Sequence, residues 1–203
     1  MDFSALDELK KKLEGFRPFP VEKMDAIREK LRLEWTYHSN ALEGNTFTLQ
    51  ETIFWLREGL TIKGKPLREH LELQNHSEAV GFLDRVIKDT RPISEFLIKE
   101  INALLLKGIT EIVVGPDKRT VSIYPGTYKT KPNNVVQMDG SIFTYTDPSH
   151  VVDEMEKLLR WHDEQKSALH PVELAAGFHH RFALIHPFED GNGRTARMLM
   201  NLI

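Results

Sequence analysis

The sequence predicts an all-α domain that carries one small β-hairpin. Apolar residues recur with helical spacing in eight segments, at about 3–14, 20–38, 49–59, 67–89, 94–106, 148–166, 171–185 and 194–203. The stretch from 107 to 147 breaks this pattern with Gly108, Pro125, Gly126 and Pro132. We therefore expect a helical core with one irregular insertion.

Local signals define several of these helices. Thr48 followed by Glu51 forms a capping box that opens the third helix, and Ser94 is placed to cap the fifth. Pro148 and Pro171 are first-turn prolines of the two helices that follow the insertion. Within the insertion, segments 135–138 and 141–145 flank Asp-Gly, which is a strong hairpin signal. Such a hairpin has free edges that can pair with an extended segment of another protein.

Composition limits the class of protein. The chain has 203 residues, of which 40% are hydrophobic and 28% charged, as is typical of one globular domain. A net charge of −3 argues against a nucleic-acid groove. The absence of cysteine excludes disulfides, thiolate zinc sites and cysteine nucleophiles. Because neither a signal peptide nor a membrane-spanning run is visible, we expect a cytoplasmic protein with no membrane partner.

Residues 186–197 combine a histidine, a carboxylate, two glycines and two arginines, which together indicate a phosphate site. Gly191 and Gly193 allow successive backbone N–H groups to turn inward around an anion. The helix expected from Arg194 adds free N–H groups at its first turn. Arg194 and Arg197 lie three residues apart, so both can reach one polyphosphate. A plain glycine turn before a helix is the simpler interpretation, but it leaves the combination unexplained.

Two further residues of this run supply chemistry. Asp190 offers oxygen ligands suited to Mg²⁺, which commonly bridges one carboxylate and substrate phosphates. His186 has an unperturbed pKa of about 6.5, so its neutral imidazole can take a proton from an attacking hydroxyl. The segment therefore contains a base, a metal ligand and a phosphate cradle.

The run resembles the signature of the Fic family, His-x-Phe-x-(Asp/Glu)-Gly-Asn-Gly-Arg-x-x-Arg, and meets every fixed position. The resemblance extends from about Ser39 to the end of the chain. It implies a mostly helical enzyme that transfers AMP from ATP, with Mg²⁺, to a hydroxyl of a target protein. Family members that act as kinases depart from Gly-Asn-Gly, and this chain does not. The resemblance implies His186 as base, with nucleotide contacts from Asp190, Gly191, Asn192, Gly193, Arg194, Thr195, Ala196 and Arg197.

The resemblance also implies a domain plan. We expect an N-terminal helical extension at 1–37 and a Fic domain at 38–203, whose C-terminal part is missing after Ile203. This domain is expected to include an inhibitory helix at about 38–44 and the signature loop at 186–197. The hairpin at about 134–146 corresponds to the family's flap, which aligns the Ser, Thr or Tyr of a target with the active site. The flap residues are Asn134, Val135, Val136 and Gln137.

A second motif lies near the N-terminus. Ser39, Glu43 and Gly44 match the inhibitory pattern (Ser/Thr)-x-x-x-Glu-(Gly/Asn) of many Fic proteins. In those members the glutamate pairs with the second arginine of the signature, here Arg197. Because a carboxylate and a phosphate use the same guanidinium donors, occupancy by one excludes the other. The chain is therefore predicted to be autoinhibited.

Three alternatives stay open. Glu43 can instead help water remove AMP from a modified target, which reverses the reaction. A non-catalytic module that binds nucleotide or target would keep the same fold. Six histidines between His150 and His186 suggest a metal hydrolase, but none of them shows the spacing of a helical metal clamp.

Overall fold

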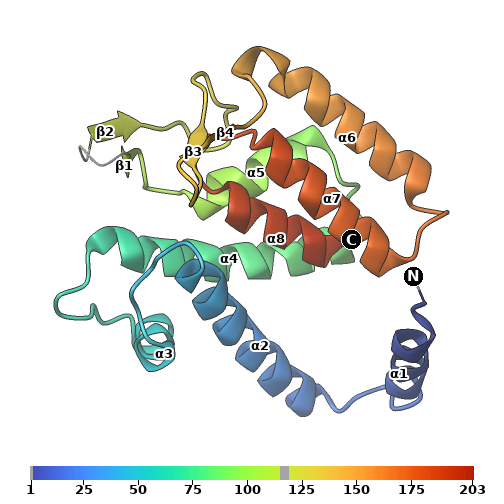
Figure 1. Ribbon diagram of the computed structural model, residues 1–203. Helices are drawn as coiled ribbons and strands as arrows, with labels where there is room; N and C mark the ends of the chain where they lie inside the picture. Colours follow the sequence, from blue (N-terminus) through green and yellow to red (C-terminus); the bar gives the residue numbers. More distant parts are fainter. Residues whose placement is uncertain (1, 115–118) are drawn as a thin grey trace.

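The computed structural model describes residues 2–114 and 119–203 of the chain (Figure 1). Its α-helices are α1 (Ser4–Glu14), α2 (Val21–Ala41), α3 (Leu49–Glu58), α4 (Leu67–Lys88), α5 (Glu95–Leu105), α6 (Val151–Gln165), α7 (Pro171–Ile185) and α8 (Asn192–Leu202). One 3-10 turn, η1 (Pro148–His150), precedes α6. Two antiparallel hairpins are formed by β1 (Glu111–Val114) with β2 (Arg119–Ser122), and by β3 (Asn134–Val136) with β4 (Ile142–Thr144). The predicted fold class is confirmed.

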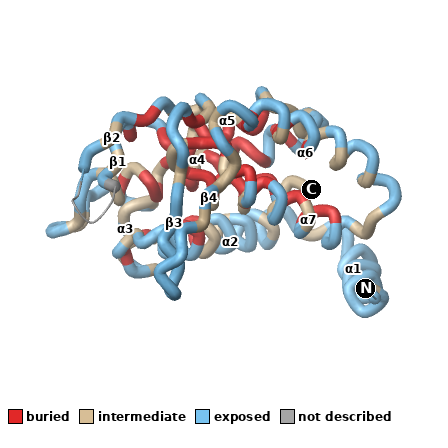
Figure 2. The backbone as a smooth tube through the Cα atoms, turned by 45° about the horizontal axis from the view of Figure 1, so that its top comes forward, coloured by how far each residue is buried: buried red, intermediate tan, exposed pale blue. Residues whose placement is uncertain are grey.

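The core lies where α4, α5, α7 and α8 meet, and α2 and α6 cover it from opposite sides (Figures 1 and 2). Leu73, Ile98, Phe178 and Met198, one from each central helix, have no exposed surface. Helix α8 contacts α2, α4, α5 and α7, so it is the element that the rest of the fold surrounds. The loop that joins α7 to α8 is consequently anchored at both ends.

The local helix signals act as the sequence predicts. Thr48 Oγ1 accepts the N–H of Glu51, and the Glu51 carboxylate accepts the N–H of Thr48, so the capping box is complete. Ser94 caps α5 by accepting the N–H of Leu97. Pro171 occupies the first turn of α7. These contacts depend only on neighbouring residues, which is why the sequence alone predicts them.

The structure also departs from the sequence prediction. The β1–β2 hairpin was not predicted, although Ile112, Val113, Thr120 and Val121 are residue types favoured in strands. Helix α8 begins at Asn192 rather than 194, because Gly191 adopts a left-handed conformation (φ 76°) as its N-cap. Helix α2 runs without interruption to Ala41, so the expected boundary between 37 and 38 falls inside a helix.

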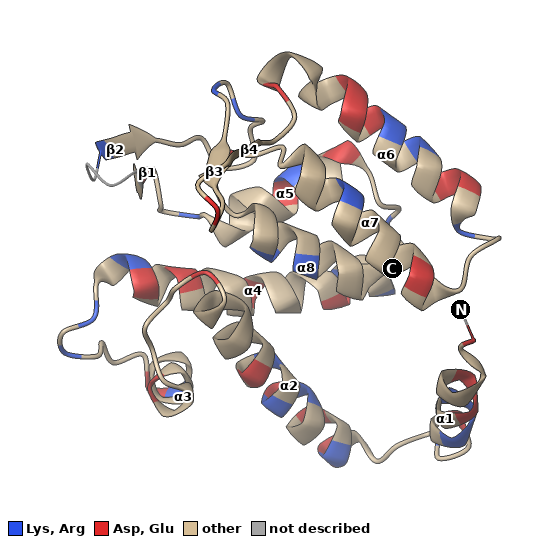
Figure 3. Cartoon of the chain, in the orientation of Figure 1, with Lys and Arg blue, Asp and Glu red and all other residues tan. Residues whose placement is uncertain are grey.

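The N-terminal helix α1 lies apart from the core and contains no buried residue (Figure 2). It meets the start of α7 through His170, which stacks on Phe3 at 4.1 Å and pairs with Asp7 at 3.3 Å. Acidic and basic residues are interspersed along α2 and α6 (Figure 3). Within the described residues, no helix has the length and apolar character needed to span a membrane.

Candidate functional site

The loop between α7 and α8 is held by a small set of backbone and side-chain contacts. The Asn192 side chain accepts the N–H of Phe188 at 2.9 Å and donates to its carbonyl at 2.8 Å. The Gly191 carbonyl accepts the N–H of Thr195 at 2.8 Å, which starts α8. Phe188 also forms an antiparallel bridge with Tyr128. In this conformation the Asn192 side chain therefore supports the loop with its oxygen and with one of the two donors of its NH2 group.

His186 lies at the C-terminal end of α7 in a left-handed conformation (φ 50°, ψ 60°). The ring of Tyr145, which follows β4, stacks on the imidazole with 3.9 Å between centroids. Burial, reinforced by the positive charge of Lys129, lowers the pKa of His186 from 6.5 to about 4, against the opposing effects of Glu43 and Asp190. The imidazole is therefore neutral at pH 7 and able to accept a proton.

Asp190 is surrounded by donors. Its Oδ2 lies 3.0 Å from Nη2 of Arg68 on α4, and its Oδ1 lies 3.5 Å from Nη2 of Arg194. Oδ1 also accepts the N–H of Gly191 at 2.6 Å, which occupies one of the amides expected to face a phosphate. Within the described part of the chain, no group of three or more acidic, histidine or cysteine side chains is placed to hold a metal. A single carboxylate beside a phosphate cradle nevertheless fits Mg²⁺ that is shared with a nucleotide.

The two arginines of α8 have different environments. Arg194 is only 2% exposed and lies between Asp190 and Glu72, with 3.6 Å from its Nη1 to Glu72 Oε1. Its Nε and Nη1 atoms have no hydrogen-bond partner among the described residues. Arg197 is more accessible, and its side chain points toward α2. The helical spacing places both arginines near the loop, but they have separate partners.

Arg197 is bound by the end of α2. Its Nη2 lies 2.6 Å from Glu43 Oε1, and it also donates to the Ser39 carbonyl at 2.9 Å. Its Nε donates to Ser39 Oγ at 2.9 Å. Gly44 has φ 90° and turns the chain away directly after Glu43. The structure thus brings Arg197 into contact with Ser39 and Glu43, which lie more than 150 residues before it in the sequence.

Glu43 also covers the start of α8. A Cβ atom added to Gly193 would collide with Glu43 Oε1 and would crowd Arg197 Nη1. Residue 193 can therefore accommodate the carboxylate only because it lacks a side chain. The Glu43 carboxylate thus lies beside Gly193 in the first turn of α8, where backbone N–H groups lack an intrahelical acceptor.

Thr195 and Ala196 are almost completely buried beneath this surface. Thr195 Oγ1 accepts a hydrogen bond from Asn102 on α5 at 3.4 Å, so its side chain faces the core. Ala196 lines a cavity of about 400 Å³ that also contains His186, Gly193 and Arg197. The same cavity is bordered by Phe143, Tyr145, His179, His180, Ala183, Leu184 and Asn192.

The β3–β4 hairpin reaches this cavity through Tyr145. Asn134, Val135 and Val136 form β3, and Val136 is 71% exposed. Gln137 begins the turn, where its N–H donates to the Ser141 carbonyl at 2.8 Å. Gly140 at φ 82° completes the turn at the predicted Asp-Gly pair. The four expected flap residues therefore lie on one exposed strand and the start of its turn.

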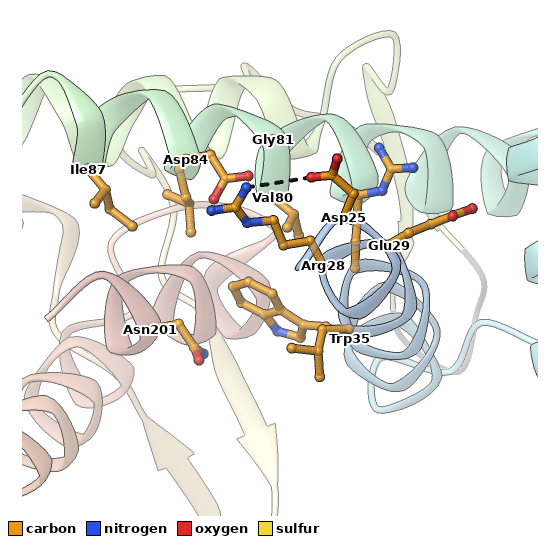
Figure 4. A pocket seen from close by; sticks show the side chains of 12 residues that line it. Asp25, Arg28, Glu29, Trp35, Val80, Gly81, Asp84, Ile87 and Asn201 are labelled. Atoms are coloured by element: carbon orange, nitrogen blue, oxygen red, sulfur yellow. Dashed lines mark ion pairs between the residues drawn. The ribbon is translucent and has the colours of Figure 1, made fainter. Parts of the chain in front are cut away.

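A larger cavity, of about 590 Å³, lies elsewhere, between α2 and α4 near the end of α8 (Figure 4). Trp35 is one of its lining residues, and Arg28 pairs with Asp25, one turn earlier on α2, at 3.8 Å. It contains none of the signature residues. Size alone therefore does not identify the active site of this fold.

Sequence reasoning did not identify four residues of the site: Arg68, Glu72, Lys129 and Tyr145. Each lies outside the signature, and each reaches it only through the packing of α4 or of the segments that flank β3 and β4. The linear pattern around these residues resembles that of ordinary surface residues. Only three-dimensional proximity reveals their roles.

The helical fold and its histidine, carboxylate and arginine loop place the chain in the class of Fic-type helical domains. The profile of the Fic/DOC family matches residues 92–203, and the chain belongs to this family. Its sequence is 35% identical over 172 residues to the protein adenylyltransferase fic-1 of Caenorhabditis elegans, covering 83% of this chain and 31% of that protein. It is 30% identical over 207 residues to the protein adenylyltransferase Fic of Nematostella vectensis, covering 100% of this chain and 45% of that protein.

Solved structures show the same relationship. A Fic domain containing signaling protein from Bacteroides thetaiotaomicron superposes with a TM-score of 0.85 at 35% identity, covering 97% of this chain and 70% of that one. Fic-1 from C. elegans, residues 134–508, superposes with a TM-score of 0.74 at 30% identity, covering 97% and 55%. The chain spans between about a third and a half of the length of the curated relatives it matches.

Proposed function

We propose that this protein transfers AMP from ATP to a hydroxyl side chain of a target protein. Membership of the Fic/DOC family and 30–36% identity to protein adenylyltransferases support the reaction class. The observation that carries the proposal is the position of a neutral His186 in one cavity with Gly193 and Arg197. Phosphoryl transfer needs a base, a glycine that lets the phosphate approach the backbone, and a guanidinium that binds the phosphate charge.

In this mechanism His186 takes the proton from the target hydroxyl. The hydroxyl oxygen then bonds to the α-phosphorus, and the bond from that phosphorus to the α,β-bridging oxygen breaks. Pyrophosphate leaves with the electron pair of the broken bond, and AMP remains on the target. The free N–H groups at the start of α8 stabilise charge on the transferred phosphoryl group, while Arg194 and Arg197 orient the β- and γ-phosphates.

Asp190 is the residue that would hold Mg²⁺ against the α- and β-phosphates. When bound, the ion supplies positive charge to the triphosphate. Asp190 projects from the loop beside the amides expected to contact the phosphates, which suits this role. The carboxylate pairs with Arg68 and Arg194 in this structure, so a metal ion would have to displace or share these partners.

We also propose that Glu43 inhibits the enzyme. The 2.6 Å ion pair with Arg197 uses the guanidinium that would otherwise bind the γ-phosphate. ATP that enters beside Glu43 would place its α-phosphate off the in-line path, and an error of about 1 Å can cost on the order of 100-fold in rate. Relief of inhibition therefore requires the release of Arg197.

The test uses labelled ATP with Mg²⁺. The Glu43→Gly protein should label itself or added proteins more strongly than the unmodified chain. Glu58→Gly, at the end of α3 and also exposed, is the matched control and should behave like the unmodified chain. Equal labelling by both variants would sink the inhibitory role. Label that survives His186→Ala in the Glu43→Gly background would sink the base assignment.

A second activity, removal of AMP from a modified target, uses the same site. Glu43 is close enough to His186 to raise the pKa of its imidazole, so its carboxylate can orient a water beside the same base. Release of AMP from a pre-modified protein, lost in Glu43→Gln, would support this direction. A target left unchanged by the unmodified chain would exclude it.

The alternative of another class is a non-catalytic module that binds nucleotide or target. This alternative requires that the Glu43–Arg197 ion pair never breaks, so that Arg197 is never free to bind a phosphate. Calorimetry that shows ATP binding to the Glu43→Gly protein, together with mass spectrometry that finds no adduct on any protein, would favour it. Docking of the target on the exposed β3 strand is part of both proposals.

A further inference from the structure

Lys129 is a buried lysine beside the active site. Its side chain is only 3% exposed. Among the residues that the structure describes, no carboxylate forms an ion pair with it within 4 Å. Lysine is almost never fully buried unless it is paired, because removing an ammonium group from water is costly. The fold therefore tolerates a destabilising charge at this position.

The polar contacts of Lys129 reach both neighbours of His186. Its backbone N–H donates to the Pro187 carbonyl at 2.8 Å. Its Nζ donates to the Ile185 carbonyl at 3.4 Å. One residue thus holds the peptide units on either side of the base.

His186 needs such support because its backbone is in the left-handed region, with φ 50° and ψ 60°. A residue with a side chain pays a steric cost there, and it stays only where its surroundings fix it. The Ile185 carbonyl is one of the free carbonyls at the end of α7, where a cation is favoured. Lys129 supplies that cation from outside the helix.

Lys129 also lies under the aromatic ring that covers the base. Its Nζ is 5.9 Å from the centroid of Tyr145, within the range of a cation–π contact. Tyr145 in turn stacks on His186 with an interplanar angle of 21°. The lysine therefore supports both the backbone and the ring of His186.

We propose that Lys129 is a positioning residue that holds the His186 imidazole in its reactive orientation. This inference rests on the proposed role of His186 as base. Lys129 itself contacts the protein around the base, and it acts on the reaction through His186.

The charge of Lys129 adds a measurable consequence. Four charged side chains act on or border the His186 site: Lys129, Glu43, Asp190 and Arg197. Two further histidines, His179 and His180, line the same cavity. Lys129 lowers the pKa of His186, whereas Glu43 and Asp190 raise it. Burial lowers the pKa of Lys129 itself to about 8, and Asp147 opposes that change. Loss of the ammonium should therefore move the pKa of His186 upward.

The experiment compares Lys129→Met, Lys129→Arg and Lys131→Met. Methionine keeps the unbranched shape up to the ε-carbon and the backbone N–H, but it removes the Nζ contact and the charge. Lys131 is two residues away and exposed, so Lys131→Met is the matched control. Proton NMR follows the titration of His186 in the otherwise unmodified chain, with His186→Ala to assign its signal. AMP transfer is measured separately in the Glu43→Gly background.

We expect Lys129→Met to raise the pKa of His186 and to lower kcat at least about tenfold at unchanged KM for ATP, because a misplaced base loses rate rather than binding. Lys129→Arg should restore both, and Lys131→Met should change neither. The thermal midpoint of Lys129→Met at pH 7 should not fall, because a buried unpaired charge has been removed.

An unchanged His186 titration in Lys129→Met, with unchanged kcat, would overturn the proposal. A lowered thermal midpoint accompanied by equal losses in Lys129→Arg would also overturn it, because the residue would then serve packing alone. If the Glu43→Gly protein transfers no AMP at all, the proposed function fails. The NMR titration still decides whether Lys129 acts on His186.

Discussion

Arg68 on α4 and Asp190 in the signature loop form an ion pair of 3.0 Å, although 122 residues separate them in the sequence. Glu72 completes the arrangement by accepting from Arg68 Nε at 3.0 Å and lying 3.6 Å from Arg194. The proposed metal ligand is thus bound to an arginine of the protein. Arg68 and a divalent cation would compete for the same carboxylate.

Removal of this arginine should strengthen metal binding. We expect Arg68→Gln to bind Mn²⁺, used as a probe for Mg²⁺, several-fold more tightly in the presence of ATP, because Asp190 Oδ2 is freed. Electron paramagnetic resonance of free Mn²⁺ measures this without catalysis. Arg85→Gln, an exposed arginine near the other end of α4, should bind as the unmodified chain does. Weaker binding in Arg68→Gln would contradict the competition.

The Ser39 hydroxyl should help to hold Arg197 in its ion pair with Glu43. Ser39→Ala removes the 2.9 Å hydrogen bond to Arg197 Nε but leaves Glu43 in place. A hydrogen bond to a charged group contributes roughly 1.5–3 kcal/mol, so partial activation is expected. Labelling by Ser39→Ala should lie between that of the unmodified chain and Glu43→Gly, and the exposed Ser122→Ala should have no effect. The idea fails if Ser39→Ala labels no better than the unmodified chain.

On acidification, the rate of AMP transfer should fall at a pH well below the ordinary pKa of histidine. Because burial lowers the pKa of His186 to about 4, the imidazole stays neutral and competent from pH 8 down to about pH 5. In the Glu43→Gly protein, kcat/KM should therefore hold over this range and fall only at or below about pH 4, because Glu43 raises the pKa of His186. A half-point near 6.5 would show that His186 is solvated like a free imidazole.

His76 should make the fold sensitive to acid. It is fully buried between α2, α4 and α8, and burial lowers its pKa to about 3. The unfolded chain binds this proton below about pH 6.5 whereas the folded chain does not, so stability falls as the pH drops from 6.5 toward 3. At 1.36 kcal/mol per pKa unit, the loss is up to about 5 kcal/mol.

Urea unfolding at pH 7 and at pH 4 measures this loss. His76→Gln should lose less stability between the two pH values than the unmodified chain. The exposed His150→Gln should lose as much as the unmodified chain. Equal losses in all three proteins would remove His76 from the explanation.

Strand β3 of the β3–β4 hairpin should be needed for the modification of protein targets and not for the binding of ATP. Val136→Lys should lower kcat/KM for proteins labelled by the Glu43→Gly enzyme, because a charge interrupts the apolar edge of β3. Binding of ATP should stay unchanged by calorimetry. Val113→Lys, at a similarly exposed position in the β1–β2 hairpin, is the control. A uniform loss in both variants would argue against a docking role for β3.

The sequence predicts those parts of the structure that depend on neighbouring residues. Thr48 and Glu51 cap a helix three residues apart, and Asp139 with Gly140 turns a hairpin, so no distant contact is needed. The signature residues are also contiguous in the sequence. The resemblance to the Fic family that they carry predicts the role of Glu43. The pairing of Glu43 with Arg197 was expected from that resemblance, while its geometry required the packing of α2 on α8.

The contacts that tune the site were not predictable in this way. Arg194 and Arg197 share a helical face by spacing, yet Arg194 is buried between Glu72 and Asp190 because α4 packs behind α8. Lys129 occurs in a segment rich in prolines and exposed residues, and nothing local marks it as buried. The burial and the partners of such residues depend on which segments pack together. The spacing of residues along one helix does not predict that packing.

Gly193 imposes a constraint on how this protein can change over evolution. A Cβ atom at residue 193 would overlap Glu43 Oε1 and lie 3.1 Å from Arg197 Nη1, so even alanine there would require the Glu43 side chain to move. If Glu43 inhibits as proposed, a substitution at residue 193 would disturb the inhibitor and the floor of the proposed phosphate site together. Substitutions at the end of α2 would act on the proposed inhibitor alone, so that side of the contact is the one that can vary with the least effect on the signature loop.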